Sequence, residues 1–196
     1  MDGHSVLLDG VCKAYGCYRG TPEELLLKLT EDLPDVVAFT HDHLDHYDDG
    51  FAKLYEQKTG RKVLDWNTDN SVTFGPIKIT AIPTRHLGKN DTPHVSFILE
   101  GSSCIWFVGD GTPNELCRFK GLPEPDVLIV PYAYASTSSS FGKTVALGAH
   151  SVVIVHLPDR EQDQYRLYDT VNKITEGCTD PEILIPDIGE SLSFPK

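Results

Sequence analysis

Short runs of consecutive apolar residues recur along the chain and alternate with segments of helical periodicity. The clearest runs are 35–40 (DVVAFT), 104–110 (CIWFVGD), 126–131 (DVLIVP) and 151–156 (SVVIVH). Runs of about six residues that are apolar throughout are typical of strands buried on both faces of a sheet. The alternation of such strands with helical segments predicts an α/β fold.

Four segments have the features of helices. Residues 21–29 are expected to form a helix capped by Thr21, with Pro22 at the first helical position. Residues 49–60 form an amphipathic segment that Gly60 should close. A short helical piece is expected around 142–149 and a longer helix at 162–177. Between the third strand run and the short helix, 132–141 (YAYASTSSSF) is interpreted as a polar loop.

The middle and the end of the chain add further strands. Segments 62–66, 71–74 and 77–84 are strand-like, with a Gly75-Pro76 turn between the last two. Segments 94–100 and 104–110 are predicted to pair as a hairpin, and 182–186 and 190–194 to close the chain as strands. No repeat has a solenoid period, so we expect one domain over residues 1–196.

The composition narrows the class of protein. The chain has 196 residues and a formal net charge of −12, without a cluster of Lys and Arg, so no nucleic-acid partner is expected. No stretch approaches the ~18 consecutive apolar residues of a membrane span, and the first ten residues do not resemble a signal peptide. The five cysteines are an odd number without a C-x-x-C pair, which favours reduced thiols in a cytoplasmic protein.

One stretch, THDHLDHYD at 40–48, contains three histidines and three aspartates in nine residues. Further metal-binding residue types follow or end later strand runs, at His86, Asp110 and His156. Since sites in open α/β sheets lie beyond the strand ends, these side chains are expected to converge.

The spacing in this stretch indicates how one loop could serve two metal ions. In an extended chain alternate residues share a side, so we expect His41, His43 and Asp45 to face one way and His46 a neighbouring point. His86 could complete the first set and His156 the second, with the two carboxylate oxygens of Asp110 bridging them. Imidazole and carboxylate ligands suit zinc, iron or manganese.

The motifs THDHLDH, TRHLG, FVGDGT and IVHLPD, in this order, resemble the metallo-β-lactamase superfamily. The chain is most similar to its small hydrolase-like branch, which includes the ascorbate-6-phosphate lactonase group, from about Ser5 to the closing IGESLSF. The resemblance implies a four-layer αβ/βα sandwich. It also implies that His41, His43 and His86 bind one metal ion. Asp45, His46 and His156 would bind the other, with Asp110 bridging.

Two departures from the family pattern accompany this resemblance. Family members usually have one or two strands before the equivalent of HSVLLDG (4–10), so the first sheet is expected to lack a strand unless the true start lies upstream. A sheet that lacks this strand would have an unpaired edge, which could pair with a second copy of the chain. A homo-oligomer is therefore one of the alternatives. The loop at 132–141 matches no substrate-specific pattern.

These residues predict a hydrolase of a small-molecule substrate. Two divalent ions, zinc first and manganese or iron as alternatives, would generate hydroxide from a bridging water to cleave an ester, lactone or phosphodiester bond. Asp45 and Asp110 are the candidate catalytic residues. The alternatives are a di-iron redox or oxygen-binding protein on the same fold and a non-catalytic metal-binding sensor. A structural metal site and a surface chelator are less consistent with seven shared ligands.

Other residues are weaker candidates for the site. Asp9 ends the first strand and could orient a ligand histidine. His94 begins a strand near His86, where an ordinary hydrogen-bonded histidine is expected more than a pocket residue. Loop surface is expected for Tyr132 and Tyr134, with binding of substrate polar groups as the alternative. Arg85 and Lys89 could bind an anion, although solvated surface is the ordinary role.

Overall fold

The structure, a computed structural model, describes residues 1–68, 71–88, 91–119 and 121–194. Its strands form two sheets. In the smaller sheet β1 (Val6–Leu8) pairs in parallel with β2 (Val36–Ala38). The larger sheet has seven strands in the order of the chain, from β3 to β9.

The larger sheet is antiparallel in its first half and parallel in its second. The antiparallel part contains β3 (Ser71–Phe74), β4 (Ile77–Pro83), β5 (Val95–Glu100) and β6 (Cys104–Phe107). The parallel part continues from β6 through β7 (Val127–Pro131), β8 (Ser151–Val155) and β9 (Glu182–Leu184). The predicted hairpin between 94–100 and 104–110 is therefore confirmed, and the parallel strands bring their carboxyl ends to one edge.

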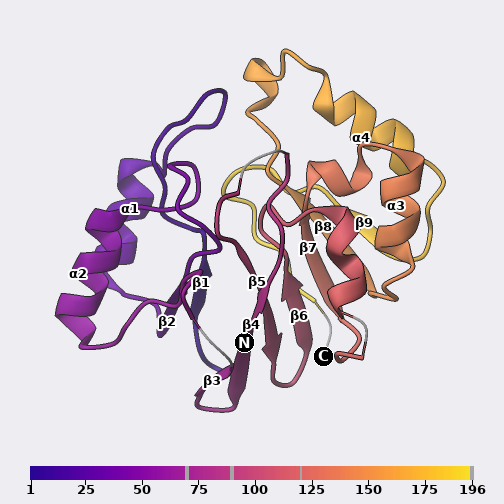
Figure 1. The fold of residues 1–196 in the computed structure, drawn as a ribbon. Helices are drawn as coiled ribbons and strands as arrows, with labels where there is room; N and C mark the ends of the chain where they lie inside the picture. Colours follow the sequence, from indigo (N-terminus) through magenta and orange to yellow (C-terminus); the bar gives the residue numbers. More distant parts are fainter. Residues whose placement is uncertain (69–70, 89–90, 120, 195–196) are drawn as a thin grey trace.

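Helices cover the outer face of each sheet, as Figure 1 shows. Next to the small sheet lie α1 (Glu23–Glu31) and α2 (Asp49–Thr59), and next to the large sheet lie α3 (Ser138–Val145) and α4 (Leu167–Thr175). Short 3₁₀ segments span Pro113–Phe119, Tyr132–Ala135 and Arg160–Gln162. The layers are helix, sheet, sheet and helix, so the predicted αβ/βα sandwich is confirmed.

Strand β2 is apolar at every position because its two faces pack into two different apolar layers. Val36 and Ala38 pack toward the large sheet, against residues such as Ile79 and Phe97. Val37 faces the opposite way, into the layer that contains Tyr55 of α2. Since successive strand residues point to opposite faces, a strand between two apolar layers needs apolar residues at every position. A third apolar layer lies between the large sheet and α3–α4.

Helix α2 follows the histidine-rich stretch directly and fixes the direction in which the chain leaves it. Asp48 caps the helix, with its Oδ1 accepting a hydrogen bond from the backbone N–H of Phe51 at 2.8 Å. Gly60 ends the helix in the left-handed conformation, at φ 70°. The predicted bounds of this helix are confirmed. They were predictable because both cap residues are of the types that those positions favour.

Several predicted elements are shorter or differ in kind. The helix predicted at 21–29 begins at Glu23, and Thr21 does not cap it, because its hydroxyl accepts from Cys12 N and donates to Gly10 O. Residues 62–66 form only an isolated bridge, Leu64 to Ala38, and 190–194 form no strand. The helix predicted at 162–177 is limited to α4. Local patterns do not show whether a partner strand lies alongside.

The segment 132–141 is not the loop that its polar composition predicts. It forms the 3₁₀ segment Tyr132–Ala135 and the first turn of α3, which Thr137 caps by accepting from Ser140 N at 3.1 Å. The prediction of loop surface for Tyr134 is wrong, since that side chain is 1% exposed and belongs to the layer beneath α3 and α4.

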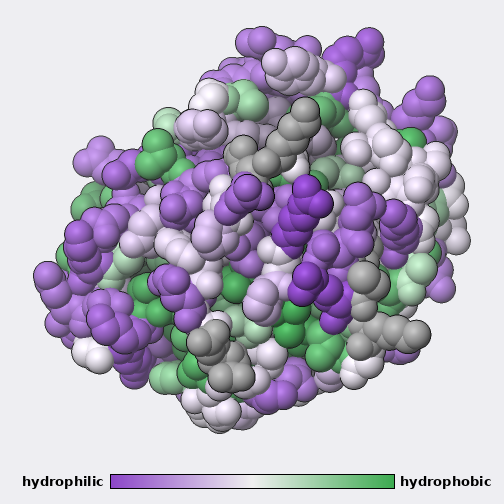
Figure 2. Space-filling view, viewed as in Figure 1, coloured by the Kyte–Doolittle hydropathy of each residue, from purple (hydrophilic) through white to green (hydrophobic). Residues whose placement is uncertain are grey.

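Figure 2 shows a mainly hydrophilic face, with separate hydrophobic patches low on the molecule. In the part of the chain that the structure describes, no helix has the length and apolarity needed to cross a membrane.

Candidate metal centre

The histidine-rich stretch leaves β2 as an irregular segment and then turns. The carbonyl of His43 accepts hydrogen bonds from the N–H groups of His46 and Tyr47, at 3.0 and 2.9 Å. This turn corrects the prediction that His41, His43 and Asp45 share one side of an extended chain. It moves Asp45 away from the first two histidines and places it beside His46.

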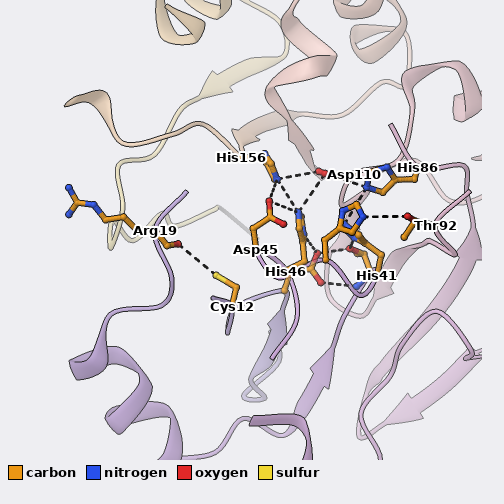
Figure 3. Close-up of polar contacts among 12 residues, drawn as sticks. Cys12, Arg19, His41, Asp45, His46, His86, Thr92, Asp110 and His156 are labelled. Atoms are coloured by element: carbon orange, nitrogen blue, oxygen red, sulfur yellow. Dashed lines mark hydrogen bonds and ion pairs between the residues drawn. The ribbon is translucent and has the colours of Figure 1, made fainter. Parts of the chain in front are cut away.

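Among the described residues three groups of three potential ligands result, and the group of Asp9, His41 and His46 shares its histidines with the other two. In the first of these two, one ligand atom each from His41, His43 and His86 lie within 4.8 Å of one another. In the second, the same is true of Asp45, His46 and His156. The Nε2 atoms of His41 and His86 are 3.3 Å apart, and those of His46 and His156 are 3.0 Å apart. Figure 3 shows the labelled side chains of both groups converging from separate segments.

Asp110 lies between the two groups. Its Oδ2 is 3.6 Å from His46 Nε2 and 3.7 Å from His86 Nε2, and its Oδ1 is 3.6 Å from His156 Nε2. The carboxylate thus faces ring nitrogens of both groups. The structure brings together all seven side chains predicted from the sequence.

The residues present fit a pair of divalent cations. Buried Oδ1 atoms of Asp45 and Asp110 have no hydrogen-bond partner among the described residues, which is costly for a carboxylate unless a cation or a water lies against it. Two nitrogens bound tetrahedrally to one zinc ion would be ~3.3 Å apart, close to the spacing within each group. The set contains imidazole and carboxylate but no thiolate, which suits zinc, manganese or iron.

The charges of the cluster are strongly coupled. Burial alone would lower the pKa of His46, but hydrogen bonds to Asp110 and Asp9 outweigh it and raise that pKa to about 10. Burial would raise the pKa of Asp110, but His46 and the other histidines hold it well below its ordinary value. Burial keeps the pKa of His41 far below its ordinary value, so this ring is neutral and free to bind a cation.

Asp9 holds a ligand histidine of each group through hydrogen bonds. Its Oδ2 accepts a hydrogen bond from His46 Nδ1 at 2.9 Å and another from the Thr40 hydroxyl at 2.6 Å. Since that hydroxyl donates to Asp9, its oxygen accepts from His41 Nδ1, 2.9 Å away. Both rings therefore direct Nε2 toward the cluster, one held by Asp9 itself and the other through Thr40.

Comparison with known proteins agrees with this geometry. A family model described as the beta-lactamase superfamily domain matches residues 1–156. The chain belongs to the metallo-β-lactamase superfamily. A curated relative from Methanoregula boonei, named "UPF0173 metal-dependent hydrolase", is 24% identical over 83% of each chain.

Two solved structures have a similar fold at low sequence identity. A possible metal-dependent hydrolase from Veillonella parvula is 17% identical, with a TM-score of 0.69 over 99% of this chain and 94% of the other. The metallo-β-lactamase fold protein YhfI from Bacillus subtilis is 20% identical, with a TM-score of 0.63 over 95% and 86% of the two chains.

In this superfamily member two residues of the site have left-handed backbones. Asp9 has φ 47° and His156 has φ 60°, a conformation that is uncommon for residues other than glycine. Each lies one residue beyond the end of its strand, β1 or β8. The turn that each makes there directs its side chain into the cluster, where strain of this kind often accompanies function.

Gly109, next to Asp110, allows close packing against Thr40. It has φ 52°, and a Cβ on it would lie 2.6 Å from Thr40 Cγ2 and 2.8 Å from Thr40 Cβ. We predict that Gly109→Ala lowers the free energy of unfolding by about 3 kcal/mol, from the left-handed backbone and overpacking together. Denaturant unfolding measures this, with Gly142→Ala as the control, since a Cβ on Gly142 meets open space. Equal stability of the two variants would contradict the prediction.

His94 is buried but is not among the grouped ligands. The Ser96 hydroxyl donates to Val108 O, so the Thr84 hydroxyl donates to Ser96 and accepts from His94 Nδ1, 2.8 Å away. Burial lowers the pKa of His94 to about 3, so the ring is neutral. The expected hydrogen bond is present at Nδ1, whereas the buried Nε2 has no hydrogen-bond partner among the described residues.

The remaining candidates are divided between the site and the surface. Arg85 is exposed, and Lys89 lies outside the described residues. The ring of Tyr132 lies 6.4 Å from that of His156, so it borders the cluster. Sequence reasoning missed Thr40 and Tyr18, whose ring packs edge-on against His156 at 4.4 Å. Nothing in the local pattern distinguishes either residue, because each role depends on contacts distant in sequence.

Proposed function

We propose that the protein is a metal-dependent hydrolase that holds two divalent cations and cleaves an ester, lactone or phosphodiester bond in a small-molecule substrate. The observation that carries this proposal is the convergence of two ligand groups on one shared carboxylate, Asp110. Zinc is the first expectation for the ions, with manganese and iron as alternatives.

When bound, the two cations would supply a hydroxide nucleophile at neutral pH and polarise the bond under attack. The residues of the chain would provide the rest. His41, His43 and His86 would hold one cation, and Asp45, His46 and His156 the other. Asp110, which faces ring nitrogens of both groups, would help to hold both. Asp45, with Oδ1 free of other partners among the described residues, could also orient the attacking group.

The burial of the cluster supports catalysis more than simple chelation. The side chains of His46, His86 and Asp110 are 6, 7 and 12% exposed, and Asp9 and Thr40 hold ligand rings in position from behind. A surface chelator needs no such support. The name of the Methanoregula relative, a metal-dependent hydrolase, agrees with this proposal.

The experiment combines metal dependence with turnover. We predict that chelation abolishes hydrolysis across a panel of lactone, phosphodiester and thioester substrates, and that zinc or manganese restores it. Chelation should also lower the free energy of unfolding by about 4 kcal/mol at metal concentrations near a thousand times the dissociation constant.

Three results would count against the proposal. A protein that retains no metal and stays inactive after restoration would overturn it. Bound iron with a visible charge-transfer band would favour the di-iron alternative over a colourless zinc hydrolase. A metal-loaded protein that turns over no substrate of the panel would favour a sensor.

A further inference from the structure

A cavity of about 300 Å³ opens beside the second ligand group. Asp45, His46 and His156 form one wall of it. The wall beyond them is largely apolar and is contributed by Leu8, Phe107, Val155, Leu157, Pro158 and Ile188. This volume is at the small end of the range for ligand sites, so it suits a small group next to the reacting bond.

Tyr18 is a residue of the cavity lining that also contacts the cluster. Its ring packs edge-on against that of His156, with the ring centroids 4.4 Å apart. A phenol keeps its proton at neutral pH, so the Tyr18 hydroxyl is a hydrogen-bond donor. Tyr18 is held on a short loop by paired backbone hydrogen bonds with Tyr15.

The cavity offers no unpaired cation among the described residues that line it. Arg19 is the cationic residue of the lining, and its guanidinium forms an ion pair with Asp159. Figure 3 shows the Arg19 side chain pointing away from Asp45 and His156. The chain as a whole carries a charge of −12, which disfavours the approach of anions. A negatively charged group placed against the apolar residues, on the side away from the ligand group, would lose its hydration without a partner.

We propose that this cavity holds the uncharged, apolar acyl portion of a carboxylic ester or lactone, and that Tyr18 donates a hydrogen bond to the reacting carbonyl oxygen. The inference rests on the proposed function and narrows its substrate class. Hydrolysis adds the oxygen of water to the acyl carbon and breaks the bond from that carbon to the alkoxy oxygen. One proton of the water goes to the alcohol that leaves, and Tyr18 keeps its own. Its donation stabilises the negative charge that develops on the carbonyl oxygen.

The test compares two esters with four-carbon acyl groups, of which one ends in a methyl group and the other in a carboxylate. The probes are p-nitrophenyl butyrate, which is neutral, and mono-p-nitrophenyl succinate, which carries a carboxylate at the end of an acyl group of similar length. For the metal-loaded protein we expect kcat/KM to be at least about tenfold higher for the butyrate, because the cavity cannot solvate the extra charge. Equal values, or a preference for the succinate, would overturn the inference.

Two variants test the two parts of the inference separately. Tyr18→Phe should lower kcat for the butyrate at least about tenfold, whereas Tyr15→Phe, on the same loop with an exposed side chain, should leave it unchanged.

Ile188→Lys places a cation on the cavity wall. It should lower the ratio of kcat/KM for the butyrate to kcat/KM for the succinate about threefold. Its control is Leu25→Lys, an exposed apolar residue on α1 with the same change of net charge. An unchanged kcat in Tyr18→Phe, or the same ratio in both lysine variants, would contradict the corresponding part.

Failure of this inference is distinguishable from failure of the proposed function. A protein that binds metal and hydrolyses the phosphodiesters of the panel, but neither ester and no lactone or thioester, would overturn the assignment of an acyl substrate alone. A protein that binds no metal and hydrolyses nothing would overturn both.

Discussion

Replacement of Asp110 with alanine is expected to lower metal content from about two ions per chain to about one or fewer, and activity by more than about 100-fold. The carboxylate faces ring nitrogens of both ligand groups, at 3.6 and 3.7 Å. Its removal leaves His46 without one of its three carboxylate partners and opens both groups at once. Elemental analysis of the purified variant and kcat/KM on the best panel substrate provide the measurement.

Asp42→Ala is the matched control for this variant. Asp42 lies within the same histidine-rich stretch but is exposed and belongs to neither group. We expect the control to keep its metal and its activity. Full metal occupancy in Asp110→Ala would show that the carboxylate does not bridge the two ions.

The second large effect is expected from Asp9→Asn, which should weaken metal binding at both groups by about 10- to 100-fold. The substitution keeps a residue type that tolerates the left-handed backbone at position 9. It removes the negative charge that holds His46 Nδ1 directly and His41 through the Thr40 hydroxyl. Competition with a chromophoric chelator measures each affinity.

Thr40→Val tests the contact to His41 separately from the direct contact between Asp9 and His46. Valine keeps the shape of threonine but cannot accept from His41 Nδ1, so the loss should be confined to the group that contains His41. Equal losses at both groups in Thr40→Val would contradict the geometry described for Asp9. So would unchanged affinities in Asp9→Asn.

The seven grouped side chains were predictable because their residue types and order along the chain are specific. Runs that are apolar throughout placed Asp110 and His156 at strand ends, and the strand-like segment 77–84 placed His86 near another. Strand ends that point the same way meet at one edge of a sheet. The position of Asp45 was not predictable from alternation along the chain. The hydrogen bonds from His46 and Tyr47 to the His43 carbonyl turn the backbone there, and an extended pattern does not contain that turn.

The supporting residues could not be identified from local sequence. Thr40 acts because Asp9, 31 residues away, accepts its hydroxyl hydrogen. Tyr134 is buried because the helical layer of α3 and α4 covers it, although its neighbours are polar. Both depend on tertiary contacts, which override the composition of the surrounding segment.

The central claim is that the two ligand groups hold a pair of metal ions. The most direct test is elemental analysis of protein purified without chelators, repeated after reconstitution with zinc or manganese. The geometry predicts about two transition-metal ions per chain, with Asp110→Ala retaining about one or fewer. Wild-type protein that binds none after reconstitution, or that holds one ion regardless of Asp110, would contradict it.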